Sequence, residues 1–294
     1  MQSINIKMKL NSLILTGFFS FTLSCSSISV AQNSSVIPLF NNKDLNNWDT
    51  YIGPGLDSAG KHRTEVPAYG INQDPLKVFS VVNVEGSHAI RISGERFGGL
   101  STKEEYSDYV LRLKFKWGKL KWAPKDKAKM DSGILYHAVG PHGVDWGFWM
   151  RSQEFQIQEG DCGDYWGLDG ASFDIPSSKN IKVEYQYDAL GSVQTFSNDN
   201  TIGRHCIKSI DGELETGQWN SVELYCHGDT AVHVVNGKTN MVLYRSRHIK
   251  NSVETPLTRG KIQIQSEGAE IYYTDITLSP ILAIPVSVLP ARSK

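Results

Sequence analysis

The sequence has little of several features that would point directly to a function. Its 30 lysine and arginine residues balance 31 aspartate and glutamate residues, and the net charge of −1 leaves no electrostatic footprint for nucleic acid. Its four cysteines form no CxxC or zinc-type spacing, and none is paired convincingly with a histidine as a nucleophile. No internal repeat is evident, and there is almost no helical periodicity. We therefore expect no nucleic-acid partner, no cysteine-based zinc site and no helical fold.

Long apolar runs are also missing, apart from Leu13–Leu23, which follows Lys7 and Lys9 and is too short to span a bilayer comfortably. This pattern predicts an export signal with two alternative ends. The small residues at 29–31 predict a signal peptide of residues 1–31. The run Thr22-Leu23-Ser24-Cys25 resembles a degenerate lipobox, which predicts a lipoprotein signal of residues 1–24 and a lipid anchor at Cys25. Both alternatives place the protein in the periplasm or attached to the outer membrane, without a transmembrane segment.

Three cysteines remain after the signal, at positions 162, 206 and 226. An odd number in an oxidising compartment leaves at least one thiol free. A disulfide between Cys206 and Cys226 is one interpretation, and burial of all three as small hydrophobic residues is the favoured one.

Short stretches of alternating apolar and polar residues predict β-strands. The clearest is Tyr109–Trp117, in which the apolar residues share one face and the basic residues share the other. Asn236-Gly237 is the strongest hairpin signal in the sequence. Further strands are expected at Phe79–Val84, His88–Ser93, Gly133–Ala138, Glu154–Gln158, Ile181–Tyr187, Thr230–Val235, Met241–Tyr244, Lys261–Gln265 and Ile271–Leu278.

The segments between these strands are expected to be loops. Residues 51–77 are rich in glycine, proline and charge, residues 98–102 form a tight connection, and the lysine-rich residues 118–130 form a solvated loop. Many short strands with regular turns predict an all-β fold, an antiparallel β-sandwich. Because no proline- or serine-rich linker divides the chain, we expect one domain over residues 36–279, followed by a C-terminal tail of residues 280–294.

The segment Asp131–Trp166 concentrates side chains that bind sugars. Aromatic faces stack on the apolar face of a pyranose, and amides and carboxylates hydrogen-bond its hydroxyl groups. Polar residues also alternate with apolar ones in two expected strands, so that their polar faces would meet if both lie on the same sheet. These polar residues are Glu154, Gln156 and Gln158 in one strand and Gln263, Gln265 and Glu267 in the other.

Several motifs, taken in order, resemble the bacterial 3-keto-disaccharide hydrolase family over about residues 36–279. They begin with Leu39-Phe40-Asn41-Asn42-Lys43-Asp44-Leu45 before Trp48, and continue through residues 100–109, 132–136, 154–157, 217–220, 236–237 and 260–265. The resemblance implies a concanavalin-A-like jelly roll with a sugar site on its concave sheet. The chain departs from the family at Asp131, where asparagine is usual, and at Ser266-Glu267, where a histidine is frequent. These departures suggest a subfamily.

The resemblance further implies that the protein cleaves 3-keto-glycosides by C2 deprotonation, elimination at C1 and hydration. The candidates for proton transfer are Glu154, His137, His142 and Glu267. The candidates for binding the carbohydrate substrate are Gln156, Tyr136, Trp146, Trp149, Arg151, Trp166 and Gln265. A divalent ion (Ca, Mg or Mn) is a possible cofactor, with Asp131, Glu159 and Asp161 as oxygen ligands, although turn capping is the favoured role of the aspartates.

Two alternatives stay open. A retaining glycoside hydrolase on the same fold would need two carboxyl groups about 5–5.5 Å apart, and Gln156 stands where laminarinase-type relatives carry aspartate, which argues against it. A non-catalytic glycan-binding module would share the same architecture.

Overall fold

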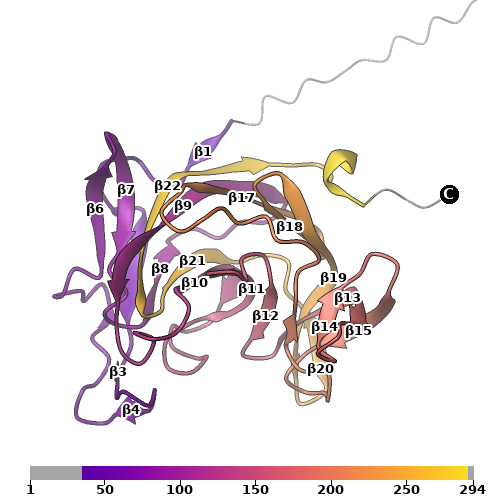
Figure 1. Ribbon diagram of the computed structural model, residues 1–294, viewed down its shortest axis with the longest axis horizontal. Helices are drawn as coiled ribbons and strands as arrows, with labels where there is room; N and C mark the ends of the chain where they lie inside the picture. The colour runs from indigo at the N-terminus through magenta and orange to yellow at the C-terminus, as the bar shows by residue number, and fades with distance from the viewer. Residues whose placement is uncertain (1–34, 291–294) are drawn as a thin grey trace, which may run out of the picture. The chain divides into compact units, whose positions relative to one another are not determined.

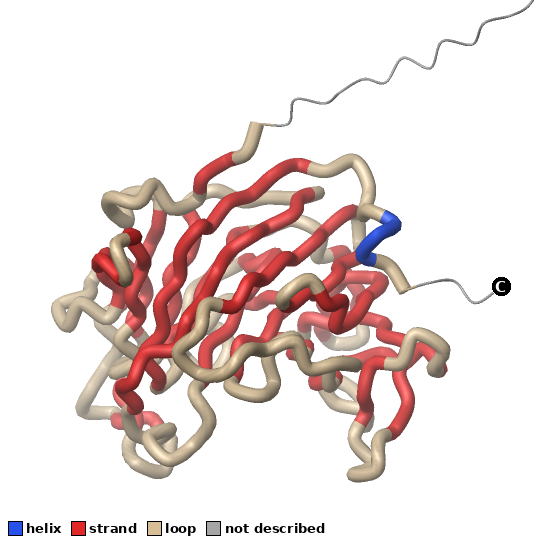
Figure 2. The backbone as a smooth tube through the Cα atoms, turned by 45° about the horizontal axis from the view of Figure 1, so that its top comes forward, coloured by secondary structure: helices blue, strands red, loops and turns tan. Residues whose placement is uncertain are grey.

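The computed structural model describes residues 35–290, and β-strands form almost all of their regular structure (Figure 2). The one helical element of residues 35–290 is a short 3-10 turn, η1 (Val286–Val288), in the C-terminal tail. Within residues 35–290, no helix is long and apolar enough to cross a membrane. The expected export signal and the lipid anchor at Cys25 lie outside the described residues.

Two antiparallel sheets lie one over the other (Figure 1). The larger sheet has twelve strands, nine of them in the order β14-β13-β19-β18-β17-β9-β22-β7-β6. Its strands are β1 (Ile37–Pro38), β6 (Phe79–Val84), β7 (Ser87–Ile92), β9 (Tyr109–Lys121), β13 (Ala171–Lys179), β14 (Tyr185–Tyr187), β15 (Ser192–Phe196), β17 (Asn220–His227), β18 (Thr230–Val235), β19 (Lys238–Lys250), β20 (Val253–Pro256) and β22 (Ala269–Pro280).

The smaller sheet has eight strands in the order β16-β12-β11-β10-β21-β8-β2-β5. They are β2 (Trp48–Ile52), β5 (Gly70–Ile71), β8 (Gly98–Thr102), β10 (Asp131–Val139), β11 (Arg151–Gln158), β12 (Tyr165–Leu168), β16 (His205–Cys206) and β21 (Lys261–Ser266). A separate two-stranded hairpin is formed by β3 (Gly55–Leu56) and β4 (His62–Arg63).

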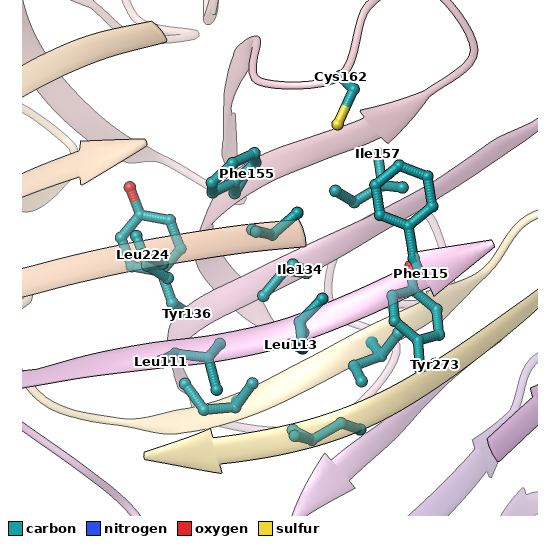
Figure 3. Close-up of a cluster of buried hydrophobic side chains, with 14 of the residues drawn as sticks. Leu111, Leu113, Phe115, Ile134, Tyr136, Phe155, Ile157, Cys162, Leu224 and Tyr273 are labelled. Carbon is teal, nitrogen blue, oxygen red and sulfur yellow. The ribbon is translucent and has the colours of Figure 1, made fainter. Parts of the chain in front are cut away.

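The hydrophobic core fills the space between the two sheets. Leu111, Leu113 and Phe115 come from the larger sheet, and Ile134 and Phe155 come from the smaller one (Figure 3). All five are buried, as the period-two pattern of β9, β10 and β11 predicts. Because alternate residues of a strand point to opposite faces, Glu154 and Gln156 project from the smaller sheet on the side turned away from this core.

The antiparallel sandwich predicted from the sequence is confirmed. β6 and β18 have the predicted bounds, and the hairpin at Asn236-Gly237 joins β18 to β19. Four predictions were wrong in whole or in part. Residues 98–102 form a buried central strand, β8; part of residues 51–77 is in short strands; and β9 runs on to Lys121. The strand expected at Ile181–Tyr187 is only three residues long, β14, and residues 181–184 are not in a strand.

The three cysteines of the described residues are buried and free. Cys206 lies in β16 of the smaller sheet and Cys226 in β17 of the larger one. The favoured interpretation, burial as small apolar side chains, is therefore confirmed, and the alternative disulfide is wrong.

Candidate active site

A hollow of about 230 Å³ lies on the smaller sheet, and we call it the inner hollow. Three strands, β10, β11 and β21, run side by side beneath it, and loops carry the remaining side chains to its rim. The residues that line it are Lys125, Asp131, Asp145, Trp146, Trp149, Glu154, Gln156, Gln158, Trp166, Leu168, Arg204, Gln265 and Glu267. The two polar strand faces expected from the sequence therefore do meet in one place.

The floor of the inner hollow requires a glycine. Gly133 pairs with Gln156 in the register of β10 and β11. A Cβ atom at this position would lie 2.3 Å from Oε1 of Gln265 and 2.4 Å from Oε1 of Glu154, which is far inside van der Waals contact. Both oxygens therefore lie directly over Gly133, and any larger residue would displace the glutamate or the glutamine.

Lys125 lies between two carboxyl groups at one side of the inner hollow. Its ammonium group donates to Asp131 and, at 2.5 Å, to Oε1 of Glu267. The loop that carries Lys125 is held against β21 by a hydrogen bond from the backbone of Trp122 to the carbonyl of Gly268, 2.8 Å long. Burial alone would lower the pKa of Lys125, but the two carboxylates outweigh it and raise this pKa.

One ammonium group cannot compensate two buried carboxylates. Burial, followed by the charge of Asp131, raises the pKa of Glu267 to about 8 against the opposing effect of Lys125. Burial raises the pKa of Asp131 as well, against Lys125 and a hydrogen bond of 2.6 Å from Gln158, which both favour its ionised form. With a pKa of about 8, Glu267 is mostly protonated at neutral pH.

Glu154 is the second carboxyl group with a strongly perturbed pKa. Burial raises this pKa well above its usual range, the charges of Glu267 and Asp131 raise it further, and Arg204 opposes them. Two neighbouring buried carboxyl groups whose pKa values are both raised can exchange protons with a bound molecule.

Unpartnered oxygens converge on the inner hollow. Asp131 Oδ1, Asp145 Oδ2, Gln156 Oε1 and Gln265 Oε1 are buried and have no hydrogen-bond partner in the described part of the chain. Buried polar atoms are normally satisfied, so these four call for a ligand or water that donates hydrogen bonds. A polyhydroxylated molecule supplies such donors.

Tryptophans form the walls. Trp149 is buried and its indole donates to the carbonyl of Gly98, whereas Trp146 is 48% exposed. Trp166 stacks on His205 and lies beneath the guanidinium of Arg204. Exposed indole faces beside unpartnered oxygens are the combination that a sugar ring requires.

His137 and Tyr136 were expected in the site, and the structure places both elsewhere. The register of β10 shifts between Tyr136 and Val139, and His137 adopts a positive φ of 51° there. The shift turns the His137 ring into the core, where it lies against Tyr109, and burial lowers its pKa to about 4. The Tyr136 side chain lies between the sheets (Figure 3), and its hydroxyl bonds to His233.

His142 and Arg151 were also expected in the site and lie outside the inner hollow. His142 stacks on Tyr51 and bonds to Gln263, further along the same face. Arg151 precedes Glu154 by three positions, so it projects from the opposite face of β11, and it pairs with Asp169 at 2.5 Å.

The three residues expected to bind a metal do not converge. Asp131 pairs with Lys125, Asp161 pairs with Lys129 at 2.6 Å, and Glu159 accepts a hydrogen bond from Thr216 at 2.6 Å. Within residues 35–290, no group of three or more histidine, cysteine, aspartate or glutamate side chains is arranged to hold a metal ion. The expected set of ligands is therefore wrong.

Sequence reasoning missed three charged residues of the inner hollow. Lys125 was hidden in a run of lysines interpreted as solvated, Asp145 lies in an irregular loop, and Arg204 precedes a strand of only two residues. Asp145 and Arg204 pair at 3.2 Å. No local sequence pattern distinguishes these three residues from surface residues, because only the packing of their loops brings them to the hollow.

Several solved structures are similar to this chain. A proposed glycosyl hydrolase from Parabacteroides distasonis is 17% identical, with a TM-score of 0.44, 84% of this chain covered and 100% of the other. A protein of unknown function with a galectin-like fold from Bacillus subtilis is 12% identical, with a TM-score of 0.40 and 83% and 94% covered. A β-glucanase from Bacillus licheniformis is 10% identical, with a TM-score of 0.38 and 84% and 98% covered.

No curated protein matches the chain significantly. A family model does match it, over residues 35–279, and it describes a 3-keto-alpha-glucoside-1,2-lyase-like domain. This range includes both sheets and every residue that lines the inner hollow. The chain therefore belongs to the 3-keto-alpha-glucoside-1,2-lyase-like family, and it is a carbohydrate-active protein.

Proposed function

We propose that the protein cleaves 3-keto-glycosides by eliminating the C1 substituent and then adding water. The observation that carries this proposal is the pair of carboxyl groups with raised pKa, Glu154 and Glu267, in one hollow with the ammonium group of Lys125. A ketone at C3 makes the C2 proton acidic, because the resulting carbanion is delocalised into the carbonyl. The reaction therefore needs a base, a cation for the enolate and an acid.

Complementarity orients the sugar. The unpartnered oxygens of Asp131, Gln156 and Gln265 accept hydrogen bonds, so hydroxyl groups face them. The C3 carbonyl can only accept, so it faces a donor, and Lys125 is a donor beside Glu267. In this orientation the proton on the neighbouring C2 lies at Glu267, and C1, on the other side of C2, lies toward Glu154.

The position of Lys125 assigns the roles. Lys125 donates to Glu267 and favours its ionised form, so Glu267 acts as the base, while Glu154, whose pKa burial raises well above its usual range, acts as the acid. Glu267 takes the C2 proton, and the developing charge on the C3 oxygen is stabilised by Lys125. The C1–O bond then breaks, and the leaving oxygen takes the proton of Glu154.

The first half of the reaction gives an alcohol and an enone with a double bond between C1 and C2. Water then adds across this bond, with its oxygen bonded to C1 and a proton delivered to C2. Glu267 exchanges the proton that it took with solvent and then delivers a solvent-derived proton to C2, and Glu154, now ionised, activates the water. The net change is hydrolysis to a 3-keto sugar and an alcohol, and both carboxyl groups return to their starting states.

The experiment is cleavage of methyl 3-keto-α-glucoside in D₂O, followed by NMR of the product. Elimination and hydration incorporate deuterium at C2, whereas direct displacement at C1 leaves the C2 proton in place. 3-Keto-glucose incubated alone with the enzyme controls for exchange after cleavage. Cleavage of unoxidised methyl α-glucoside with full retention of the C2 proton would instead establish a conventional glycoside hydrolase.

A further inference from the structure

Three adjoining hollows lie on the outer face of the larger sheet, away from the inner hollow. Their volumes are about 440, 460 and 830 Å³. The first and second share Lys114, Ser221 and Asp275, and the second and third share Val84 and Glu85. We call this row of hollows the outer groove. It crosses β17, β9 and β22, which run side by side (Figure 1), and it shares no lining residue with the inner hollow.

The cations that β9 contributes to the outer groove are neutralised one by one. Leu113 and Phe115 are buried in the core, so the residues that alternate with them point outward. Each of these outward cations pairs with a carboxylate from another segment: Arg112 with Glu223 at 3.2 Å, Lys114 with Asp275 at 2.9 Å and Lys116 with Glu85 at 2.5 Å. The three pairs carry no net charge, so they do not select a phosphate or an acidic sugar. The groove therefore suits an uncharged ligand.

Trp219 supplies an aromatic surface in the middle of the outer groove. The next residue, Asn220, is buried, so the indole of Trp219 points outward with Ser221. Its Nε1 donates to Oε2 of Glu85 at 3.0 Å, and the ammonium group of Lys116 lies 5.8 Å from the ring centre. Trp219 lines the second hollow and Lys116 the third, so the indole presents to the second hollow a surface that this cation does not cover. A ring already fixed in this way can stack on a sugar at little cost in rotamer freedom.

A β-bulge brings hydrogen-bonding groups to the same hollow. The register of β22 with β9 shifts between Thr274 and Thr277, and Asp275 adopts a positive φ of 53° there. A bulge re-aims a side chain, and here the carboxylate of Asp275 reaches Lys114. The side chains of Lys114 and Asp275 are 50% and 60% exposed, so their pairing leaves donor hydrogens and acceptor oxygens open to a ligand. Hydroxyl groups can use both kinds of partner.

We propose that the outer groove is a second carbohydrate site, which binds a chain of uncharged sugar units and takes no part in catalysis. The ligand is a chain because the hollows follow one another, and the first and third share no residue. Trp219 stacks on one unit, and the Lys114–Asp275 pair binds hydroxyl groups beside it. Because the groove and the inner hollow lie on different sheets, a polysaccharide in the groove leaves the inner hollow open to a small substrate. The site holds the enzyme at a polysaccharide, and it does not depend on the proposed reaction.

The test is affinity electrophoresis in native gels that each contain one neutral polysaccharide: soluble starch, mixed-linkage β-glucan, arabinoxylan or galactomannan. We expect at least one of the four to retard the unchanged protein. Trp219→Ala loses the stacking contact and should raise the dissociation constant about tenfold, whereas Trp219→Phe keeps an aromatic face and most of the affinity. Tyr244→Ala is the matched control and should bind like the unchanged protein, because Tyr244 is a 41% exposed aromatic residue of β19 outside the groove.

A variant of the inner hollow separates the two sites. Gly133→Ala adds a Cβ that displaces Glu154 and Gln265, and it should be retarded like the unchanged protein. Trp219→Ala should keep the kcat/KM of the unchanged protein for methyl 3-keto-α-glucoside. Retardation by none of the four polysaccharides, retardation that persists in Trp219→Ala, or retardation that is lost in Gly133→Ala would each overturn the inference. If the unchanged protein cleaves no 3-keto-glucoside, the proposed function fails, and the gels still decide this inference.

Thermal unfolding shows whether Trp219→Ala is folded. If it is not, Asp275→Asn takes its place, because asparagine tolerates a positive φ and removes the charge that holds Lys114. Weaker retardation of Asp275→Asn than of the unchanged protein supports the second site, and equal retardation refutes it.

Discussion

The ammonium group of Lys125 donates to Oε1 of Glu267 at 2.5 Å, although 142 residues separate them in the sequence. Lys125 also donates to Asp131, so one cation serves two buried carboxyl groups. Because Lys125 cannot neutralise both groups, burial and the charge of Asp131 still raise the pKa of Glu267 to about 8. An acid that is protonated at rest and ionised slightly above neutrality is therefore placed beside a cation that can accept developing negative charge.

Replacing Glu154 with glutamine is expected to lower kcat/KM for a 3-keto-glucoside by roughly 10²- to 10⁴-fold, the usual contribution of a general acid or base. Glutamine keeps the size of the side chain but cannot donate a proton to the leaving oxygen. Steady-state kinetics on methyl 3-keto-α-glucoside measures the effect. A rate close to that of the unchanged protein would remove Glu154 from the mechanism.

The same variant is expected to be more stable than the unchanged protein, and increasingly so as the pH rises. A carboxyl group whose pKa is raised on folding binds its proton more tightly in the folded state, so its contribution to stability falls as the pH rises above its unfolded value, about 4.3. The contribution of glutamine to stability does not depend on pH. Thermal unfolding of both proteins at pH 5 and pH 8 measures how much more stable the variant is. The same difference in unfolding temperature at both pH values would contradict the prediction.

kcat/KM is expected to rise through neutrality with a midpoint near pH 8, the pKa of Glu267, and to level off about one pH unit above it. The ascending limb reports ionisation of Glu267 in the free enzyme, since the base must be deprotonated. Replacing Glu267 with glutamine should remove this limb together with most of the activity. An activity that falls between pH 6 and pH 8 would instead show that Glu267 acts as the acid. The spontaneous decay of the substrate at each pH is subtracted.

Replacing Lys125 with methionine is expected to destabilise the fold by roughly 2 kcal/mol at pH 8, because it leaves buried carboxyl groups without their cation. The loss should shrink at pH 5, where Glu267 is protonated in either protein. Lys127→Met is the matched control, because Lys127 is exposed on the same loop. Chemical denaturation at the two pH values gives the comparison, and equal losses in both variants would contradict the role of Lys125.

Replacing Gly133 with alanine is expected to abolish activity, because the added Cβ displaces Glu154 and Gln265 from the floor of the inner hollow. Gly99→Ala is the matched control. Its Cβ would lie 2.5 Å from the side chain of Gln263, a comparable clash on β21 outside the inner hollow. Both variants should unfold at similar temperatures, but only Gly133→Ala should lose kcat. Equal loss of activity would show a general effect of strain.

Period-two alternation predicted much of the fold and part of the site, because it determines which residues of a strand share a face. It correctly separated Glu154 and Gln156 from Phe155 and Ile157, and it brought Gln265 to the same sheet face. It failed where a strand departs from regularity. In β10 the shift in register turns His137 into the core, and no residue type in that stretch marks the shift.

The loop residues of the site could not be predicted for a different reason. Lys125 is one of several lysines in residues 118–130, and only the packing of that loop against Gly268 brings it, rather than its neighbours, between two carboxyl groups. Asp145 and Arg204 likewise meet through tertiary contacts across 59 residues of sequence. Such pairings depend on the assembled fold, which a local pattern does not encode.

The position of Trp166 has a consequence for the order in which products leave. In the proposed reaction, the enone stays in the inner hollow, and the alcohol leaves past Trp166 into the adjoining hollow of about 490 Å³, which this indole also lines. We expect the alcohol to diffuse away first and to leave water a route to C1 along the path that it vacates. Hydration would then follow release of the first product, and the reverse reaction would be suppressed because the alcohol no longer lies beside the double bond.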